Sequence, residues 1–198
     1  MSIARKKFDE FVNSLTPEQI DKFKSLADSQ KPEVMLIACS DSRILAHEIL
    51  GSHPGEVFIL RNAGNNIPPY DSRSPSNEAL SVQFAVDVLN VKEIVVCGHA
   101  NCGAMSGILD LEGTRGFECV HDRLAECAEQ FPEGYVDELR KDANKKQALK
   151  QLTRENVRLQ IENLKSYDFI NKAIESRQLK IYGWVYDFVN SELDIVVD

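Results

Sequence analysis

Three short apolar runs, each followed at once by a polar cluster, constrain the fold of this chain most strongly. The runs occupy residues 34–38, 57–60 and 94–97, and they lead into CSDSR (39–43), RNAGN (61–65) and GHANCG (98–103). Continuous apolar runs of this length are typical of strands buried on both faces of a parallel sheet. Because ligands collect beyond the carboxyl ends of such strands, the polar clusters are the first place to look for a functional site.

Helical periodicity surrounds these runs. Apolar residues recur at helical spacing over residues 8–15, and a second helix is expected to begin at Pro17 with Thr16 as its cap. Residues 77–90 predict a helix that carries Leu80, Phe84 and Val88 along one stripe. The chain opens with helices and then alternates strands with helices, which favours an α/β fold with a mostly parallel central sheet flanked by helices.

The second half of the chain is expected to be helical before it returns to the sheet. Residues 105–175 read mainly as helix, most clearly over 147–164. Residues 179–186 alternate as a strand does, and the turn near Asn190 predicts a hairpin with residues 193–197. We expect one domain over residues 1–198, with an N-terminal helical arm over about residues 1–30.

Composition narrows the choice of partners. Of 198 residues, 43% are hydrophobic and 27% are charged, as in globular proteins, and 31 acidic against 23 basic residues give a net charge of −8. This acidic balance argues against binding to nucleic acid or to anionic lipid. No apolar run approaches the roughly 20 residues that cross a bilayer, and the N-terminus is too polar for a signal peptide. We therefore expect neither nucleic-acid nor membrane binding, and a cytoplasmic location.

The five cysteines indicate metal chemistry rather than disulfides. Their number is odd and their spacing irregular, and no pair has the two-residue spacing of a redox motif. GHANCG has the glycine spacing of a phosphate loop but lacks the lysine and hydroxyl residue that should follow. His99 and Cys102, with Cys39 at a neighbouring strand end, offer one nitrogen and two sulfurs, which suits zinc with an open fourth position. Packing of these side chains in the core is the alternative, since free cysteine is commonly buried.

Asp41 and Arg43 lie next to the first of these cysteines and favour a catalytic site. On an open surface such a pair would contribute little. Beside a metal, an arginine can hold the carboxylate in one orientation and leave an oxygen free to accept a proton from water.

The motifs CSDSR, RNAGN and GHANCG, in this order, resemble those of the β-class carbonic anhydrases. The resemblance extends over about residues 30–107 and implies that Cys39, His99 and Cys102 bind Zn²⁺. It also implies that Asp41 and Arg43 form a catalytic dyad. In this family the metal generates hydroxide for reversible hydration of carbon dioxide to bicarbonate and a proton.

The resemblance also implies a substrate cleft at a dimer interface. Gln30, Phe58 and Gly103 match residues that line this cleft, whereas Phe84 stands where plant-like members have tyrosine. Leu36 replaces the tryptophan of members with an inhibitory bicarbonate site, which argues against that regulation. The N-terminal helices are expected to pack across a homodimer or a multiple of dimers.

Two other functions remain open at this point. The same fold supports hydrolysis of carbonyl sulfide or carbon disulfide. A non-catalytic zinc-stabilised binding protein is the other alternative, although the Asp41–Arg43 pair argues against it.

Overall fold

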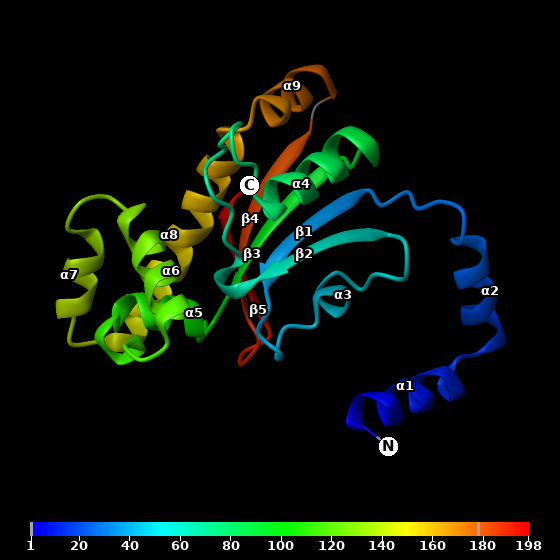
Figure 1. The fold of residues 1–198 in the computed structure, drawn as a ribbon, viewed down its shortest axis with the longest axis horizontal. Helices are drawn as coiled ribbons and strands as arrows, with labels where there is room; N and C mark the ends of the chain where they lie inside the picture. The colour runs from blue at the N-terminus through cyan, green and yellow to red at the C-terminus, as the bar shows by residue number, and fades with distance from the viewer. Residues whose placement is uncertain (1, 178) are drawn as a thin grey trace.

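A five-stranded sheet forms the centre of the computed structural model, which describes residues 2–177 and 179–198 (Figure 1). The strands are β1 (Val34–Cys39), β2 (Val57–Asn62), β3 (Glu93–His99), β4 (Lys180–Asp187) and β5 (Glu192–Val197), in the order β2-β1-β3-β4-β5. The first four are parallel, and β5 is antiparallel to β4. The mostly parallel sheet and the final hairpin are therefore as the sequence predicts.

Helices precede the sheet and connect its parallel strands. They are α1 (Ile3–Ser14), α2 (Pro17–Ser25), α3 (Ala46–Ile49), α4 (Asn77–Gln83), α5 (Gly103–Leu109), α6 (Glu118–Glu129), α7 (Tyr135–Lys141), α8 (Lys145–Lys165) and α9 (Asp168–Arg177). Short turns form η1 (Ala63–Asn65), η2 (Phe84–Val88) and η3 (Glu112–Thr114). Figure 1 shows α5, α6 and α7 gathered with α8 to one side of the sheet.

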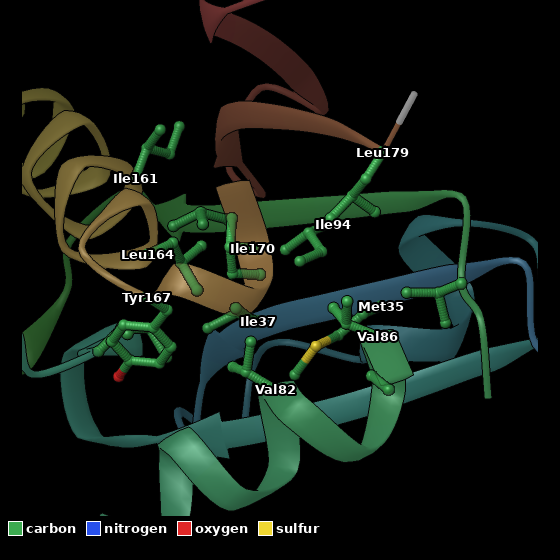
Figure 2. Packing of buried hydrophobic residues seen from close by; sticks show 14 of the residues in the cluster. Met35, Ile37, Val82, Val86, Ile94, Ile161, Leu164, Tyr167, Ile170 and Leu179 are labelled. Atoms are coloured by element: carbon green, nitrogen blue, oxygen red, sulfur yellow. The ribbon is translucent and has the colours of Figure 1, made fainter. Parts of the chain in front are cut away.

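The main core lies between the sheet and helices α4, α8 and α9. Met35 and Ile37 of β1 and Ile94 of β3 are fully buried there. Figure 2 shows these side chains meeting Val82 of α4 and the ring of Tyr167. The opposite face of the sheet packs against α3 but leaves several large side chains only partly buried, namely Val34, Val57, Ile59, Tyr182, Trp184 and Tyr186.

Glycines let α8 lie close to the sheet. A Cβ at Gly183 of β4 would lie 2.8 Å from Val157, and one at Gly98 of β3 would lie 3.0 Å from the same side chain. The first distance is shorter than real Cβ contacts and the second is tighter than most of them, so glycine in both strands lets α8 lie this close. The close packing brings the middle of α8 near the carboxyl end of β3.

The helix predicted over residues 77–90 is divided in the structure. After α4 the chain makes one π-helical turn, η2, in which the Leu89 N–H donates to the Phe84 carbonyl at 3.0 Å. The core of this segment is formed by Ala79, Val82, Ala85 and Val86. Leu80, Phe84 and Val88 point outward and are 65%, 40% and 60% exposed. The predicted apolar stripe is thus on the surface of the single chain.

Helices α1 and α2 form an arm that lies away from the rest of the chain (Figure 1). Thr16 caps α2 as expected, and Gln19 completes a capping box with it. Neither helix contains a buried residue, although both carry large apolar side chains, with Phe8, Phe11 and Phe23 each more than 40% exposed. Exposed apolar faces of this kind are typical of interaction surfaces.

Candidate metal centre and active site

Three side chains with metal-binding atoms meet where β1 and β3 end. Cys39 is the last residue of β1 and His99 the last of β3, and these strands are parallel neighbours. Cys102 follows directly before α5. The ligand atoms of the three side chains all lie within 4.8 Å of one another, and all three residues are buried. The structure thus brings together the residues that the sequence singled out.

The imidazole of His99 is oriented as a metal ligand. Its Nδ1 lies 2.9 Å from the carbonyl oxygen of Ala100, so Nδ1 carries the proton and donates it to this oxygen. Nε2 is buried and has no hydrogen-bond partner. A buried polar atom without a partner is unfavourable in a native protein. A bound metal ion would accept the Nε2 lone pair and so remove the cost of burying this atom without a partner.

The two thiols affect each other's ionisation. The neighbouring Cys102 thiol, which can donate to the Cys39 sulfur, lowers the pKa of Cys39 well below its usual range, and the Gly64 amide acts in the same direction. The neighbouring Cys39, together with burial, raises the pKa of Cys102. A second thiolate beside the first is disfavoured unless a cation lies between them. The donor set therefore fits a divalent metal that binds sulfur and nitrogen.

Asp41 and Arg43 form a two-point ion pair beside the metal-binding group. Arg43 Nε donates to Asp41 Oδ1 at 2.9 Å and Arg43 Nη2 donates to Oδ2 at 2.6 Å, while the Arg43 backbone N–H also donates to Oδ1. These bonds hold the pKa of Asp41 well below its usual range. Asp41 Oδ2 lies 3.9 Å from His99 Nε2. An ionised carboxylate of fixed orientation thus faces the metal-binding group.

Neighbouring groups hold this pair in place. Arg43 donates to the Asn101 carbonyl at 3.0 Å, and its guanidinium carbon lies 4.7 Å from the centre of the Phe188 ring. Arg61 donates to the carbonyls of Cys39 and Asp41 at 2.9 and 2.8 Å. Arg61 therefore fixes the turn that carries both a ligand and the carboxylate. Sequence reasoning did not find Phe188, because nothing local marks an aromatic ring after β4 as a partner of Arg43.

The four predicted cleft residues are distributed over two ends of the sheet. Gly103 begins α5 beside the metal-binding group, and a Cβ there would meet nothing within 4 Å. Phe58 pairs with Met35, four residues before the end of β2, or about 13 Å along the strand from Asn62. Its ring lies 5.9 Å from that of Phe84, and Gln30 is exposed before β1. A single chain does not bring Gln30, Phe58 and Phe84 to the metal-binding group.

The other cysteines lie outside the group. Burial raises the pKa of Cys97 to about 12, and this side chain packs on the second face of the sheet, as expected of a core residue. Cys127 is buried and Cys119 is exposed, both on α6. Two sulfurs and one imidazole are a donor set that catalytic zinc sites use, whereas closed structural sites have four protein ligands.

Known proteins resemble this chain in sequence and in fold. The family model described as carbonic anhydrase matches residues 34–193. The chain is 37% identical over 189 residues to a carbonic anhydrase of Pseudomonas aeruginosa, and the match covers 94% of this chain and 83% of the relative. No helix in the described part of the chain is long and apolar enough to cross a membrane.

Solved structures point to the same family. The β-carbonic anhydrase CcaA matches with a TM-score of 0.84 and 28% identity, covering 98% of this chain and 90% of that chain. One of the two tetrameric β-carbonic anhydrases of Sordaria macrospora matches with a TM-score of 0.82 and 29% identity, covering 97% and 94%. The chain belongs to the β-class carbonic anhydrases, enzymes that hydrate carbon dioxide. The resemblance inferred from the motifs is confirmed.

Proposed function

We propose that this enzyme hydrates carbon dioxide reversibly with Zn²⁺ held by Cys39, His99 and Cys102, and with Asp41 and Arg43 as its catalytic dyad. The observation that carries this proposal is the unpaired, buried Nε2 of His99 beside two thiols and an arginine-held carboxylate. When bound, zinc would acidify a water molecule at its open position and so supply a nucleophile near neutral pH.

Asp41 is suited to orient that water. Oδ1 accepts two hydrogen bonds from Arg43, one from Nε and one from the backbone N–H, whereas Oδ2 accepts one and keeps a second lone pair for another donor. Because the pKa of Asp41 is lowered, this side chain stays ionised and accepts a hydrogen bond at neutral pH rather than storing a proton. Its role is therefore to direct the water toward carbon dioxide and to receive the proton briefly on its way to solvent.

Carbon dioxide is small and apolar, so its binding site requires an apolar wall. Phe58 and Phe84 provide such a wall, but at the other end of the sheet within one chain. We infer that a second chain supplies Gln30, Phe58 and Phe84 to the cleft, next to Gly103 of the first. The exposed stripe of Leu80, Phe84 and Val88 and the unpartnered arm support a homodimer or a multiple of dimers.

The arm offers a direct test of assembly. Replacing both Phe11 and Phe23 with glutamine should weaken the dimer at least 100-fold, since two buried phenylalanine side chains contribute about 3 kcal/mol or more. Lys6→Gln with Lys22→Gln is the matched control on polar positions of the same helices. Sedimentation velocity over a range of concentrations distinguishes them. A wild type that is monomeric yet fully active would contradict the shared cleft.

Stopped-flow hydration of carbon dioxide by zinc-loaded protein tests the function. We expect rapid hydration by the wild type and only background hydration by Cys39→Ser, which lacks one sulfur ligand. A wild type no faster than Cys39→Ser would show that the proposal is wrong. Rapid release of sulfide from carbonyl sulfide, without hydration of carbon dioxide, would instead show that the enzyme hydrolyses carbonyl sulfide.

We also propose a location and a domain organisation for this protein. The free thiols of the described chain favour a reducing compartment, which supports a cytoplasmic location. Residues 1–198 are proposed to form one domain, with the arm as an extension toward the partner.

A further inference from the structure

A backbone amide is directed at one of the proposed zinc ligands. The Gly64 N–H donates to Cys39 Sγ, with 3.4 Å between nitrogen and sulfur. Gly64 has a φ of 79°, in the left-handed region that favours glycine. A Cβ at this position would lie 3.0 Å from the Ala104 Cβ on α5. The hydrogen bond to sulfur thus depends on a tightly packed glycine in a demanding conformation.

Side-chain amides hold both peptide groups that flank Gly64. The Ala63 carbonyl belongs to the same peptide group as the Gly64 N–H, and it accepts from Asn66 Nδ2 at 2.8 Å. The Gly64 carbonyl accepts from Asn156 Nδ2 at 3.1 Å. Asn66 belongs to the loop itself, whereas Asn156 is 92 residues from Gly64 in sequence and lies on α8. Asn156 therefore ties the loop to a helix of the core.

Asn156 is fixed in turn by a second buried amide. Its Oδ1 accepts from Gln160 Nε2 at 2.9 Å, and Gln160 Oε1 accepts from the Ile67 N–H at 2.6 Å. Asn156 is 1% exposed and Gln160 is 2% exposed. The Ile67 N–H can only donate, so the Gln160 oxygen must face it and the Gln160 nitrogen must face Asn156 Oδ1. The Asn156 amide therefore has one favoured orientation, with its nitrogen toward Gly64.

From these contacts we propose that Asn156 is a positioning residue of the metal centre, which holds Gly64 so that its N–H stays directed at Cys39 Sγ. The inference rests on the zinc site proposed above. Hydrogen bonds from outside the ligand set orient metal ligands and tune how strongly they donate to the metal. Their loss commonly lowers metal affinity or activity by about 10- to 100-fold.

The test is Asn156→Ala, with Zn²⁺ affinity measured by chelator competition and Co²⁺ used as a spectroscopic probe. We expect Zn²⁺ to bind about 10- to 100-fold more weakly. We also expect the sulfur-to-cobalt charge-transfer band to move to lower energy, because the sulfur lone pairs lose a stabilising hydrogen bond. Melting temperatures recorded on the same samples test whether the variant is folded. If Asn156→Ala does not fold, Asn156→Ser replaces it, because the serine hydroxyl is too short to reach Gly64.

Asn163→Ala is the matched control. Asn163 is another buried amide of α8, and it donates to the Ile67 carbonyl at 2.8 Å and to Gln130. We expect this variant to keep the cobalt band of the wild type. Equal shifts in both variants, or an unchanged band and affinity in Asn156→Ala, would overturn the inference. A wild type that binds no Zn²⁺ would instead overturn the zinc site itself.

Discussion

Replacing Asp41 with asparagine is expected to lower the rate of carbon dioxide hydration by about 100- to 10,000-fold, the usual contribution of a positioned acid–base group. Asparagine has nearly the same shape, but its amide cannot take a proton from water and offers Arg43 only one acceptor oxygen. The three proposed ligands are untouched, so zinc content should stay equal to that of the wild type. Stopped-flow assays and metal analysis on the same samples measure both quantities.

The chain contains its own control for this substitution. Asp71, Ser72 and Arg73 repeat the tripeptide of residues 41–43, and the Arg73 backbone N–H donates to Asp71 Oδ1 at 2.9 Å, as in the dyad. This second pair lies in an exposed loop. We expect Asp71→Asn to leave hydration unchanged. Comparable losses in the two variants, or loss of zinc from Asp41→Asn, would contradict a catalytic role for Asp41.

Tyr167→Ala is expected to lower the free energy of unfolding by about 3–5 kcal/mol, as for other large aromatic residues removed from a core. Tyr167 is completely buried, and its ring lies against those of Tyr70 and Phe169. Its hydroxyl donates to the Pro68 carbonyl at 2.7 Å. Tyr167→Phe removes only that hydrogen bond and should lower the free energy of unfolding by about 1 kcal/mol. Urea unfolding at one fixed protein concentration compares the variants.

The wild type and Tyr167→Phe are also expected to differ in how alkaline pH changes their free energy of unfolding. Burial raises the pKa of Tyr167 from 10.0 to about 12. Between these values the unfolded chain releases the phenolic proton while the folded chain keeps it, so stability falls as pH rises through this window. Tyr167→Phe should lose less stability than the wild type from pH 10 to 12. An equal loss in the wild type and Tyr167→Phe would show that the Tyr167 hydroxyl does not cause the pH dependence. A Tyr167→Ala variant no less stable than Tyr167→Phe would show that the ring does not stabilise the core.

Much of the sheet and the metal-binding group follows from local sequence. The apolar runs ending at Cys39 and His99 indicate buried parallel strands, and parallel strand ends meet at one edge of a sheet. The meeting of Cys39, His99 and Cys102 at one edge of the sheet could therefore be predicted without a structure. The dyad could be predicted as well, because Asp41 and Arg43 are two residues apart and need no distant partner to meet.

Other features depend on distant contacts that leave no local pattern. An asparagine such as Asn156 in the middle of a helix usually faces solvent, and nothing in its neighbourhood indicates that it reaches Gly64. Helical spacing shows that Leu80, Phe84 and Val88 share a face, but it does not show what covers that face. The π-helical turn and the packing of the helices turn this stripe outward.

The position of α8 in the chain also determines when the metal-binding group is completed during biosynthesis. All three side chains of the group have been translated by residue 102. The amide that holds Gly64 follows on α8, and β4, whose Tyr186 pairs with His99, emerges later still. Because both contacts help to hold the group, we expect it to be ordered only after α8 and β4 have been synthesised. Until then the nascent chain would present Cys39 and Cys102 as unprotected thiols, so we expect the proposed metal to bind only after nearly all of the chain has been made.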